Sequence, residues 1–146
     1  MDRRLQQRLR AHGIQPSVQR LAVADYVLET DAHPSADEVW ERVQARLPML
    51  SRATVYNTLH LFVERGLARE LVLAPGKVVF DPRMDPHHHF VDDETGAIED
   101  VPWEAVEVGD PSRLKGFEVR EYMVVMRGRK LGGPRGGAGT DREKAR

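Results

Sequence analysis

The sequence predicts an α+β fold, with a helical first half followed by a half built of short strands. Up to Gly66 the apolar residues recur at the three- and four-residue spacing of amphipathic helices, and beyond it they alternate or form short runs. The 146 residues are enough for one domain or two small ones. No cysteine is present, so disulfides and a structural zinc held by four cysteines are excluded, and a metal site needs His, Asp or Glu donors.

Four helices are predicted before Gly66. Gly13 ends the first, Pro16 starts the second, Ser35 caps the third with Glu38 three residues on, and Ser51 caps the fourth. Their apolar stripes are, in order, Leu5 and Leu9; Val18, Leu21, Ala24 and Leu28; Ala36, Val39, Trp40, Val43 and Leu47; and Val55, Leu59, Phe62 and Val63. Pro48 is expected to end the third helix and Gly66 the fourth.

Strands are predicted beyond Gly66. Residues 70–73 and 77–80 flank Ala74-Pro75-Gly76, where Pro and Gly suit the centre of a type II turn, so a hairpin is expected. Helices followed by a hairpin are the layout of a winged helix-turn-helix. Further strands are predicted at 88–91, 97–101 and 117–126, too few for a stable sheet, so a second copy is expected to extend it in a homodimer.

The predicted domains are a winged-helix DNA-binding domain at 1–80, a hinge at 81–86, a small α/β dimerisation and metal-sensing domain at 87–127 and a disordered basic tail at 128–146. The tail holds six of the twelve glycines and shows no apolar periodicity. No stretch approaches the roughly 18 apolar residues that span a bilayer, and no signal peptide follows the charged N-terminus. A cytoplasmic protein without membrane association is expected.

The fourth predicted helix carries a polar row beside its apolar one. Arg52, Tyr56 and His60 recur every four residues, with Asn57 next to them. Arg suits guanine, Asn suits adenine, and an aromatic ring packs on a thymine methyl, so this row is predicted to read double-stranded DNA in the major groove. Arg20 belongs to the basic patches expected to bind phosphate. The alternative interpretation of the polar row on the fourth helix is that it is the solvated face of an ordinary amphipathic helix.

Histidines and carboxylates gather in the second half. Residues 81–121 carry twelve acidic and four basic side chains, and the run includes His87-His88-His89. On a strand, His87 and His89 point to one side and His88 to the other. With Asp81, Asp100 and one isolated histidine they offer nitrogen and oxygen donors suited to Fe, Mn, Zn or Cu. Spacing alone does not choose between His33, His60 and His12, and a surface or proton-sensitive histidine patch is the alternative.

Three segments in this order resemble the ferric uptake regulator family: Ala32-His33-Pro34-Ser35-Ala36-Asp37, the run from Ser51 to Leu59, and Phe80-Asp81 followed by the histidines. The resemblance covers about Leu5 to Met126. It implies a winged-helix domain and a dimerisation domain joined by a hinge, with one regulatory divalent metal per subunit, Fe2+ or Mn2+, or Zn2+ in vitro. The implied metal ligands are His33, Asp81, His87, His89 and Asp100, and the implied recognition residues are Arg52, Tyr56 and Asn57.

Departures from the family pattern indicate which branch of the family the chain resembles most. Asp92 and Thr95 stand where many members carry the first CxxC pair of a structural zinc, and a short segment from Pro102 to Gly116 replaces a longer helix. No histidine follows His89, which argues against a further His-rich site. The cysteine-free chain is most similar to the iron response regulator branch, associated with haem as well as iron, and the peroxide-sensing branch shares the five-ligand site.

The sequence therefore predicts a metal-responsive DNA-binding regulator, a repressor of iron homeostasis or peroxide stress genes, and not an enzyme. The metal is expected to join the two halves and fix the dimer for operator binding. In a haem version, binding at His87, His88 or His89 would release DNA instead. A mononuclear non-haem iron enzyme using His87, His89 and Asp81 is a remote alternative, and a winged-helix module that binds only protein is another.

Overall fold

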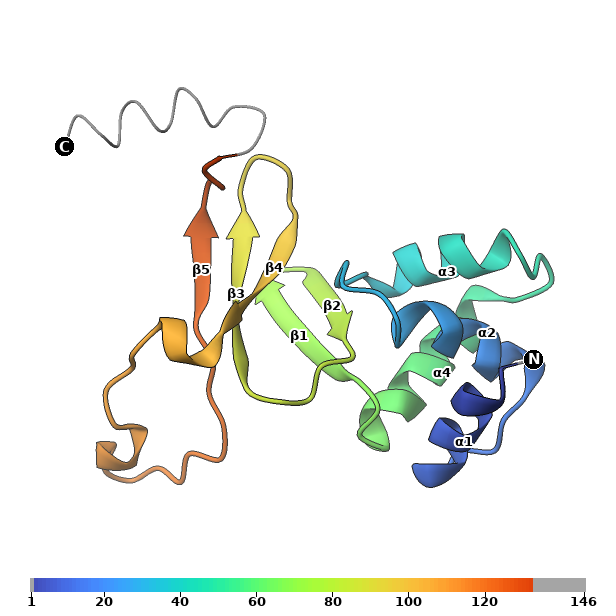
Figure 1. Cartoon of the computed structure of the whole chain (residues 1–146), viewed down its shortest axis with the longest axis horizontal. Helices are drawn as coiled ribbons and strands as arrows, with labels where there is room; N and C mark the ends of the chain where they lie inside the picture. Colours follow the sequence, from blue (N-terminus) through green and yellow to red (C-terminus); the bar gives the residue numbers. More distant parts are fainter. Residues whose placement is uncertain (1, 133–146) are drawn as a thin grey trace. The chain divides into compact units, whose positions relative to one another are not determined.

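The computed structural model describes residues 2–132 and divides into two units, Met1–Asp85 and a second that begins at Pro86 (Figure 1). Helices belong to the first unit and a three-stranded sheet to the second, so the predicted α+β class is confirmed. The predicted basic tail lies outside the described residues from position 133 onward. Among residues 2–132, no helix is long and apolar enough to cross a membrane.

Four helices build most of the first unit: α1 (Arg3–Ala11), α2 (Val18–Val27), α3 (Ala36–Gln44) and α4 (Arg52–Glu64). Each begins at a side-chain cap, provided by Asp2, Ser17, Ser35 and Ser51. At α3 the cap is a complete capping box with Glu38, as the sequence predicts. A cap satisfies backbone amides that have no partner within the helix, which is why these helices begin where they do.

Two helix boundaries differ from the prediction. Helix α2 begins at Val18 after the cap residue Ser17, and not at Pro16 as predicted. Val18 is 58% exposed because it lies in the first turn, off the buried stripe. Helix α3 ends at Gln44, before Leu47, whose amide still donates to the carbonyl of Val43. At α3 the apolar spacing extends beyond the helix, because periodicity does not record which backbone amides are bonded.

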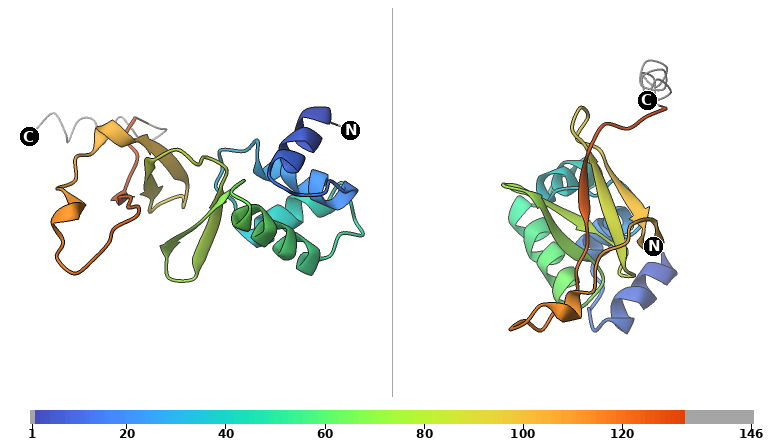
Figure 2. Two further views of the ribbon diagram at one scale, coloured as in Figure 1. Left: turned by 90° about the horizontal axis from the view of Figure 1, so that it is seen from below. Right: turned by 90° about the vertical axis from the view of Figure 1, so that its left-hand side faces the viewer.

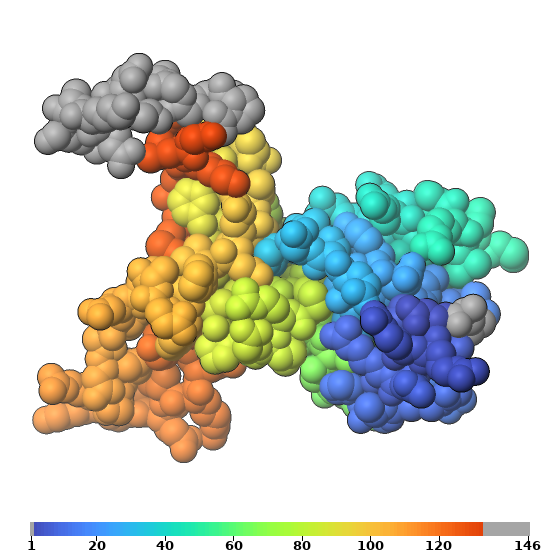
Figure 3. Space-filling view, in the orientation of Figure 1, coloured from blue at the N-terminus to red at the C-terminus, as the bar shows by residue number. Residues whose placement is uncertain are grey.

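One apolar core joins the four helices. Phe62, Leu9 and Leu59 are its largest fully buried members, and α1 packs directly against the rest of the helical unit (Figure 3). The core comprises Leu5, Leu9, Ile14, Leu21, Val23, Ala24, Val27, Leu28, Val39, Val43, Leu50, Val55, Leu59, Phe62, Leu67, Ala68 and Phe80. Because α4 contributes Val55, Leu59 and Phe62, its opposite side is left facing solvent.

A hairpin of β1 (Arg69–Ala74) and β2 (Lys77–Asp81) completes the first unit (Figure 2). Ala74 pairs with Lys77, which leaves Pro75 and Gly76 as the two central turn residues, and Gly76 has the positive φ of +73° that the predicted turn requires. The pairing of Arg69 with Asp81 places the Asp81 carboxylate at the end of the hairpin, where it is buried. Helices followed by a hairpin form the winged helix-turn-helix that the sequence predicts.

The second unit contains β3 (His87–Asp92), β4 (Ile98–Pro102) and β5 (Val125–Gly128) in the order β4-β3-β5. Strand β3 is antiparallel to β4 and parallel to β5. Two short 3-10 helices, η1 (Trp103–Ala105) and η2 (Pro111–Arg113), lie in the connection between β4 and β5. Strand β3 is therefore the central strand, and it carries the three consecutive histidines.

The predicted strand at 117–126 is mostly wrong, because β5 begins only at Val125. Residues 117–124 hold several apolar side chains but belong to no strand, and only Val124, whose carbonyl accepts from the His89 amide, reaches β3. Phe117 is 73% exposed. Alternation predicts which side chains share a face, whereas a strand also needs a hydrogen-bonded neighbour.

Candidate metal half-sites and DNA-reading surface

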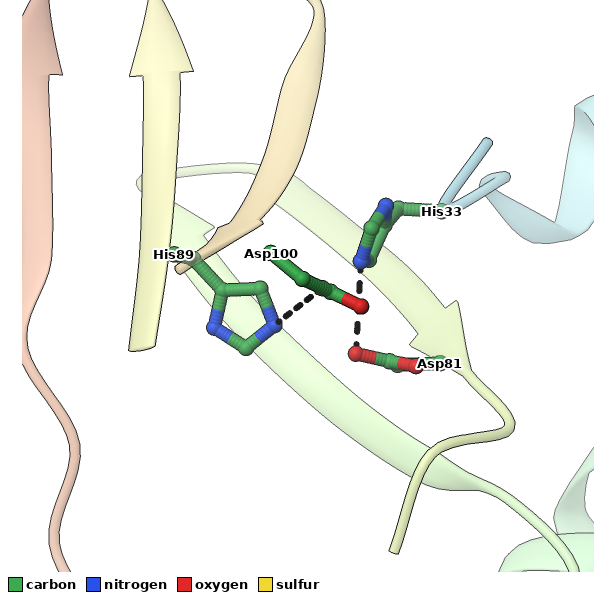
Figure 4. Close-up of side chains that lie close together, drawn as sticks. All are labelled: His33, Asp81, His89 and Asp100. Carbon is green, nitrogen blue, oxygen red and sulfur yellow. Dashed lines mark ion pairs between the residues drawn. The ribbon is translucent and has the colours of Figure 1, made fainter. Parts of the chain in front are cut away.

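The first unit holds a buried pair of possible metal donors, His33 and Asp81. Nε2 of His33 lies 3.3 Å from Oδ2 of Asp81, and each side chain is only 2% exposed (Figure 4). His33 lies between α2 and α3 with a φ of +53°, an uncommon conformation for a residue with a Cβ. The neighbouring Pro34 carbonyl accepts from the Phe80 amide at 2.9 Å, which ties this loop to β2 beside Asp81.

The second unit holds another group of donors on one face of β3. Asp100 on β4 pairs in register with His89, and its Oδ1 lies 3.3 Å from Nε2 of His87 and 3.5 Å from Nε2 of His89 (Figure 4 shows His89 facing Asp100). Both histidines are buried, and their rings meet edge to face with centroids 4.6 Å apart. The predicted alternation along the strand is thus observed, with His87 and His89 on one face.

His88 points to the other face of β3 and has different partners. Its ring stacks on Trp103 with centroids 4.6 Å apart, and its Nδ1 accepts a hydrogen bond from the Val124 amide at 2.9 Å. The side chain is fully buried. Because it lies on the opposite face of β3, His88 takes part in the packing of the sheet rather than in the group formed by His87, His89 and Asp100.

The remaining histidines are placed elsewhere in the first unit. Nδ1 of His12 lies 3.0 Å from the Arg8 carbonyl at the end of α1, and His60 is exposed on α4. Of the three histidines that spacing alone leaves open, His33 is the one paired with Asp81. The nitrogen and oxygen donors within each unit fit a borderline or hard divalent ion such as Fe2+, Mn2+ or Zn2+.

Hydrogen bonds close the turn at the positions of the missing cysteines. Oδ1 of Asp92 accepts from the amides of Glu94 at 2.8 Å and Thr95 at 3.2 Å, and the Asp92 carbonyl accepts from Gly96. The bond from the Glu94 amide is the main reason that the pKa of Asp92 is lowered, with the Thr95 bonds adding to it against the effect of burial. The turn after β3 is therefore held by a carboxylate instead of a thiolate-bound ion.

The predicted DNA-reading residues lie in two places on the first unit. Arg52 and Tyr56 on α4 contact Asp37 in the first turn of α3, a contact that the sequence analysis missed. Arg20 and the exposed Asn57 line a groove of about 400 Å³ between the start of α2 and α4. Arg20 itself donates to the Gln15 carbonyl at 2.8 Å. No sequence signal identifies Asp37, because nineteen residues separate it from Tyr56.

A winged helix-turn-helix in one unit and a sheet rich in histidine and carboxylate in the other define the class of metal-responsive, DNA-binding transcriptional regulators. The sequence pattern described as "Ferric uptake regulator family" matches residues 11–127, and the chain belongs to that family. The remote alternative of a non-haem iron enzyme is therefore wrong. Regulators of this family are DNA-binding dimers.

The most informative relatives agree with this assignment. The peroxide operon regulator of Bacillus subtilis (strain 168) is 30% identical over 122 residues, which cover 82% of this chain and 84% of the relative. The ferric uptake regulator of Pseudomonas aeruginosa with manganese superposes with a TM-score of 0.64 at 25% identity, covering 85% of this chain and 96% of that one. The Vibrio cholerae ferric uptake regulator superposes with a TM-score of 0.66 at 23% identity, covering 86% of this chain and 98% of that one, and this likeness supports the fold.

Proposed function

We propose that the protein is a metal-dependent repressor in which His33, Asp81, His87, His89 and Asp100 hold one divalent ion per subunit. The observation that supports this most strongly is that each unit carries its own buried group of histidine and aspartate donors. Neither group alone offers five donors. Sharing one ion would satisfy both groups and would connect the DNA-reading unit to the dimerisation unit.

Hydrogen bonds around the donors support a role in holding the ion. The Pro34–Phe80 hydrogen bond fixes the loop that carries His33, and the amide of Arg83 donates to Oδ1 of Asp81 at 2.9 Å. Donors fixed in this way lose little conformational freedom on binding. When bound, the ion supplies a positive charge and a set of coordination bonds between the two units.

Holding one ion with both units would restrict their relative orientation. In a homodimer this restriction would set the spacing of two α4 helices before they meet DNA, and a dimer's spacing must match two half-sites. Less orientational freedom would then be lost on binding, so the metal-bound form is expected to have the higher operator affinity. By linkage, operator DNA is expected to raise metal affinity by the same factor.

Arg52, Tyr56, Asn57 and Arg20 are proposed to contact the operator. Arg52, Tyr56 and Asn57 are exposed on the side of α4 that faces away from the core, and their side chains match guanine, thymine and adenine edges. Arg20 lies across the groove from Asn57 and is suited to a backbone phosphate. Binding with a steep salt dependence would distinguish this surface from one that binds only protein.

The test of the proposal uses His89→Ala with His12→Ala as the control. Mn2+ stoichiometry and the affinity for a DNA duplex selected by the wild-type protein are measured with and without Mn2+. His89→Ala is expected to weaken Mn2+ binding and to abolish the effect of Mn2+ on DNA affinity, whereas His12→Ala retains both. Unaltered stoichiometry and unaltered metal dependence in His89→Ala would refute the proposal.

Peroxide is the second candidate signal, supported by the 30% identity to the peroxide operon regulator of Bacillus subtilis. In this version the protein loaded with Fe2+ is oxidised at His33 or His87: hydrogen peroxide gives one oxygen atom to an imidazole ring and leaves as water. Mass spectrometry of peptides from peroxide-treated protein is expected to show a gain of one oxygen on either residue. Its absence from both residues would exclude this version.

Haem release is the remaining proposal for the signal, and titration with haem tests it by the Soret band and a gel shift. Ligation at His88 would require loss of its bond from Val124 and its stack on Trp103, so His87 and His89 are the better candidates. A haem response that survives His87→Ala combined with His89→Ala would contradict this assignment.

A further inference from the structure

An acidic side chain lies among the DNA-reading residues. The hydroxyl of Tyr56 donates to Oδ1 of Asp37 at 2.9 Å, and Nη1 of Arg52 lies 3.6 Å from the same oxygen. Asp37 is in the first turn of α3, whereas Arg52 and Tyr56 lie one turn apart on α4. One carboxylate oxygen therefore connects two reading residues to the neighbouring helix.

Arg52 has a second restraint. Its guanidinium lies over the ring of Trp40, 4.7 Å from the centroid, and Trp40 Nε1 donates to the Leu50 carbonyl at 3.1 Å. The Trp40 ring is thus held by the backbone just before α4, and Arg52 contacts both that ring and the carboxylate of Asp37. The hydrogen bond to Asp37 is also the largest reason that the pKa of Tyr56 is raised.

The contacts of Asp37 with Arg52 and Tyr56 are expected to contribute little to the stability of the fold. The side chains of Arg52 and Asp37 are 57% and 53% exposed, and exposed ion pairs contribute little to folding. A negative charge at a DNA-binding surface also opposes phosphate binding. We expect Asp37 instead to restrict the side chains of Arg52 and Tyr56 before DNA binds, which lowers the conformational entropy that they lose when they contact bases.

We propose that Asp37 is a positioning residue that determines sequence specificity by holding Tyr56 and Arg52 in their base-reading conformations. This inference rests on the proposed function, because it takes α4 as the reading helix. Asp37 acts through its contacts with these two side chains. Removing it is therefore expected to weaken recognition of the correct sequence without weakening general attraction to DNA.

The experiment compares two probes bound by the full-length protein in Mn2+. The first is the duplex that the wild-type protein selects from a random library, and the second is a scrambled duplex of the same composition. In Asp37→Ala the ratio of the two affinities is expected to fall about tenfold, the size of one good base contact. Affinity for the scrambled duplex is expected to stay the same or to rise, whereas a folding defect would lower both affinities.

Two matched variants separate positioning from other effects. Glu41→Ala removes an exposed acid from the same helix and is expected to keep the wild-type ratio. Asp37→Asn keeps an oxygen that accepts from Tyr56, and it is expected to recover most of the lost ratio. An unchanged ratio in Asp37→Ala, an equal loss in Glu41→Ala, or no recovery in Asp37→Asn would overturn the inference. Failure of the wild-type protein to select any sequence would instead refute the proposed function.

Discussion

Replacing Ser35 by alanine tests how the start of α3 is held. Ser35 lies between His33 and Asp37, and its Oγ accepts from the Glu38 amide at 3.2 Å. Glu38 returns the contact, since its Oε1 accepts from the Ser35 amide at 2.9 Å. Alanine removes the first bond and leaves the second, because the second uses the backbone of residue 35.

The expected cost follows from that single bond. Loss of one side-chain cap lowers the free energy of unfolding by about 1 kcal/mol. The bond from the backbone amide of residue 35 to Glu38 remains, so no larger loss is expected. With a urea slope near 1 kcal/mol/M, as expected for a small unit, the midpoint should fall by about 1 M. For a unit of this size, a loss of about 1 kcal/mol corresponds to a melting temperature lower by about 4–8 °C.

Urea unfolding followed by tryptophan fluorescence measures this effect. In a Trp103→Phe background Trp40, on α3 itself, becomes the only tryptophan and reports on the first unit. Ser35→Thr retains a hydroxyl cap and serves as the control. An unchanged midpoint in Ser35→Ala, together with unchanged helical circular dichroism, would refute the capping argument.

Three further predictions concern other parts of the chain. Phe117→Asp, which places a charge on an unpaired apolar segment, is expected to convert the dimer to monomer in sedimentation, whereas the equally drastic Met49→Asp is not; a dimeric Phe117→Asp would contradict this. Because the pKa of Asp92 is lowered in the folded chain, its stabilisation is complete above about pH 4 and is lost as the pH falls through the lowered pKa. The protection factor of the Glu94 amide, which compares its exchange rate with that of an unstructured peptide at the same pH, should therefore fall in acid. Asp92→Ala should remove this pH dependence of the protection factor, and a persisting dependence would assign it to another group. Arg52→Ala is expected to weaken binding to the selected duplex by about tenfold or more, and an equal loss on scrambled DNA would show that Arg52 contacts only phosphate.

Local signals in the sequence predict much of the fold. The Ser35 and Glu38 pair predicts the start of α3, and Pro75-Gly76 predicts the hairpin turn, because each depends on residues within one turn of the chain. The alternation of His87, His88 and His89 is predictable for the same reason. These features need no knowledge of distant parts of the chain.

Features that depend on distant partners are not predictable in this way. The segment 117–124 has a strand-like pattern but forms no strand, and Asp37 meets Tyr56 only because α3 and α4 pack together. The pairing of His33 with Asp81 likewise requires the loop before α3 to reach β2. Spacing alone does not choose between His12, His33 and His60 as the partner of Asp81, whereas the family resemblance implies His33.

The most direct test of the shared metal site is Mn2+ titration of four proteins: wild type, His33→Ala, His89→Ala and the double variant. His33 and Asp81 belong to the first unit and His89 belongs to the second. With one ion shared by both units, the wild-type protein binds one Mn2+ per chain, each single variant loses tight binding, and the double variant is little worse than either. Two Mn2+ per chain in the wild type, with each single variant retaining one, would contradict the account.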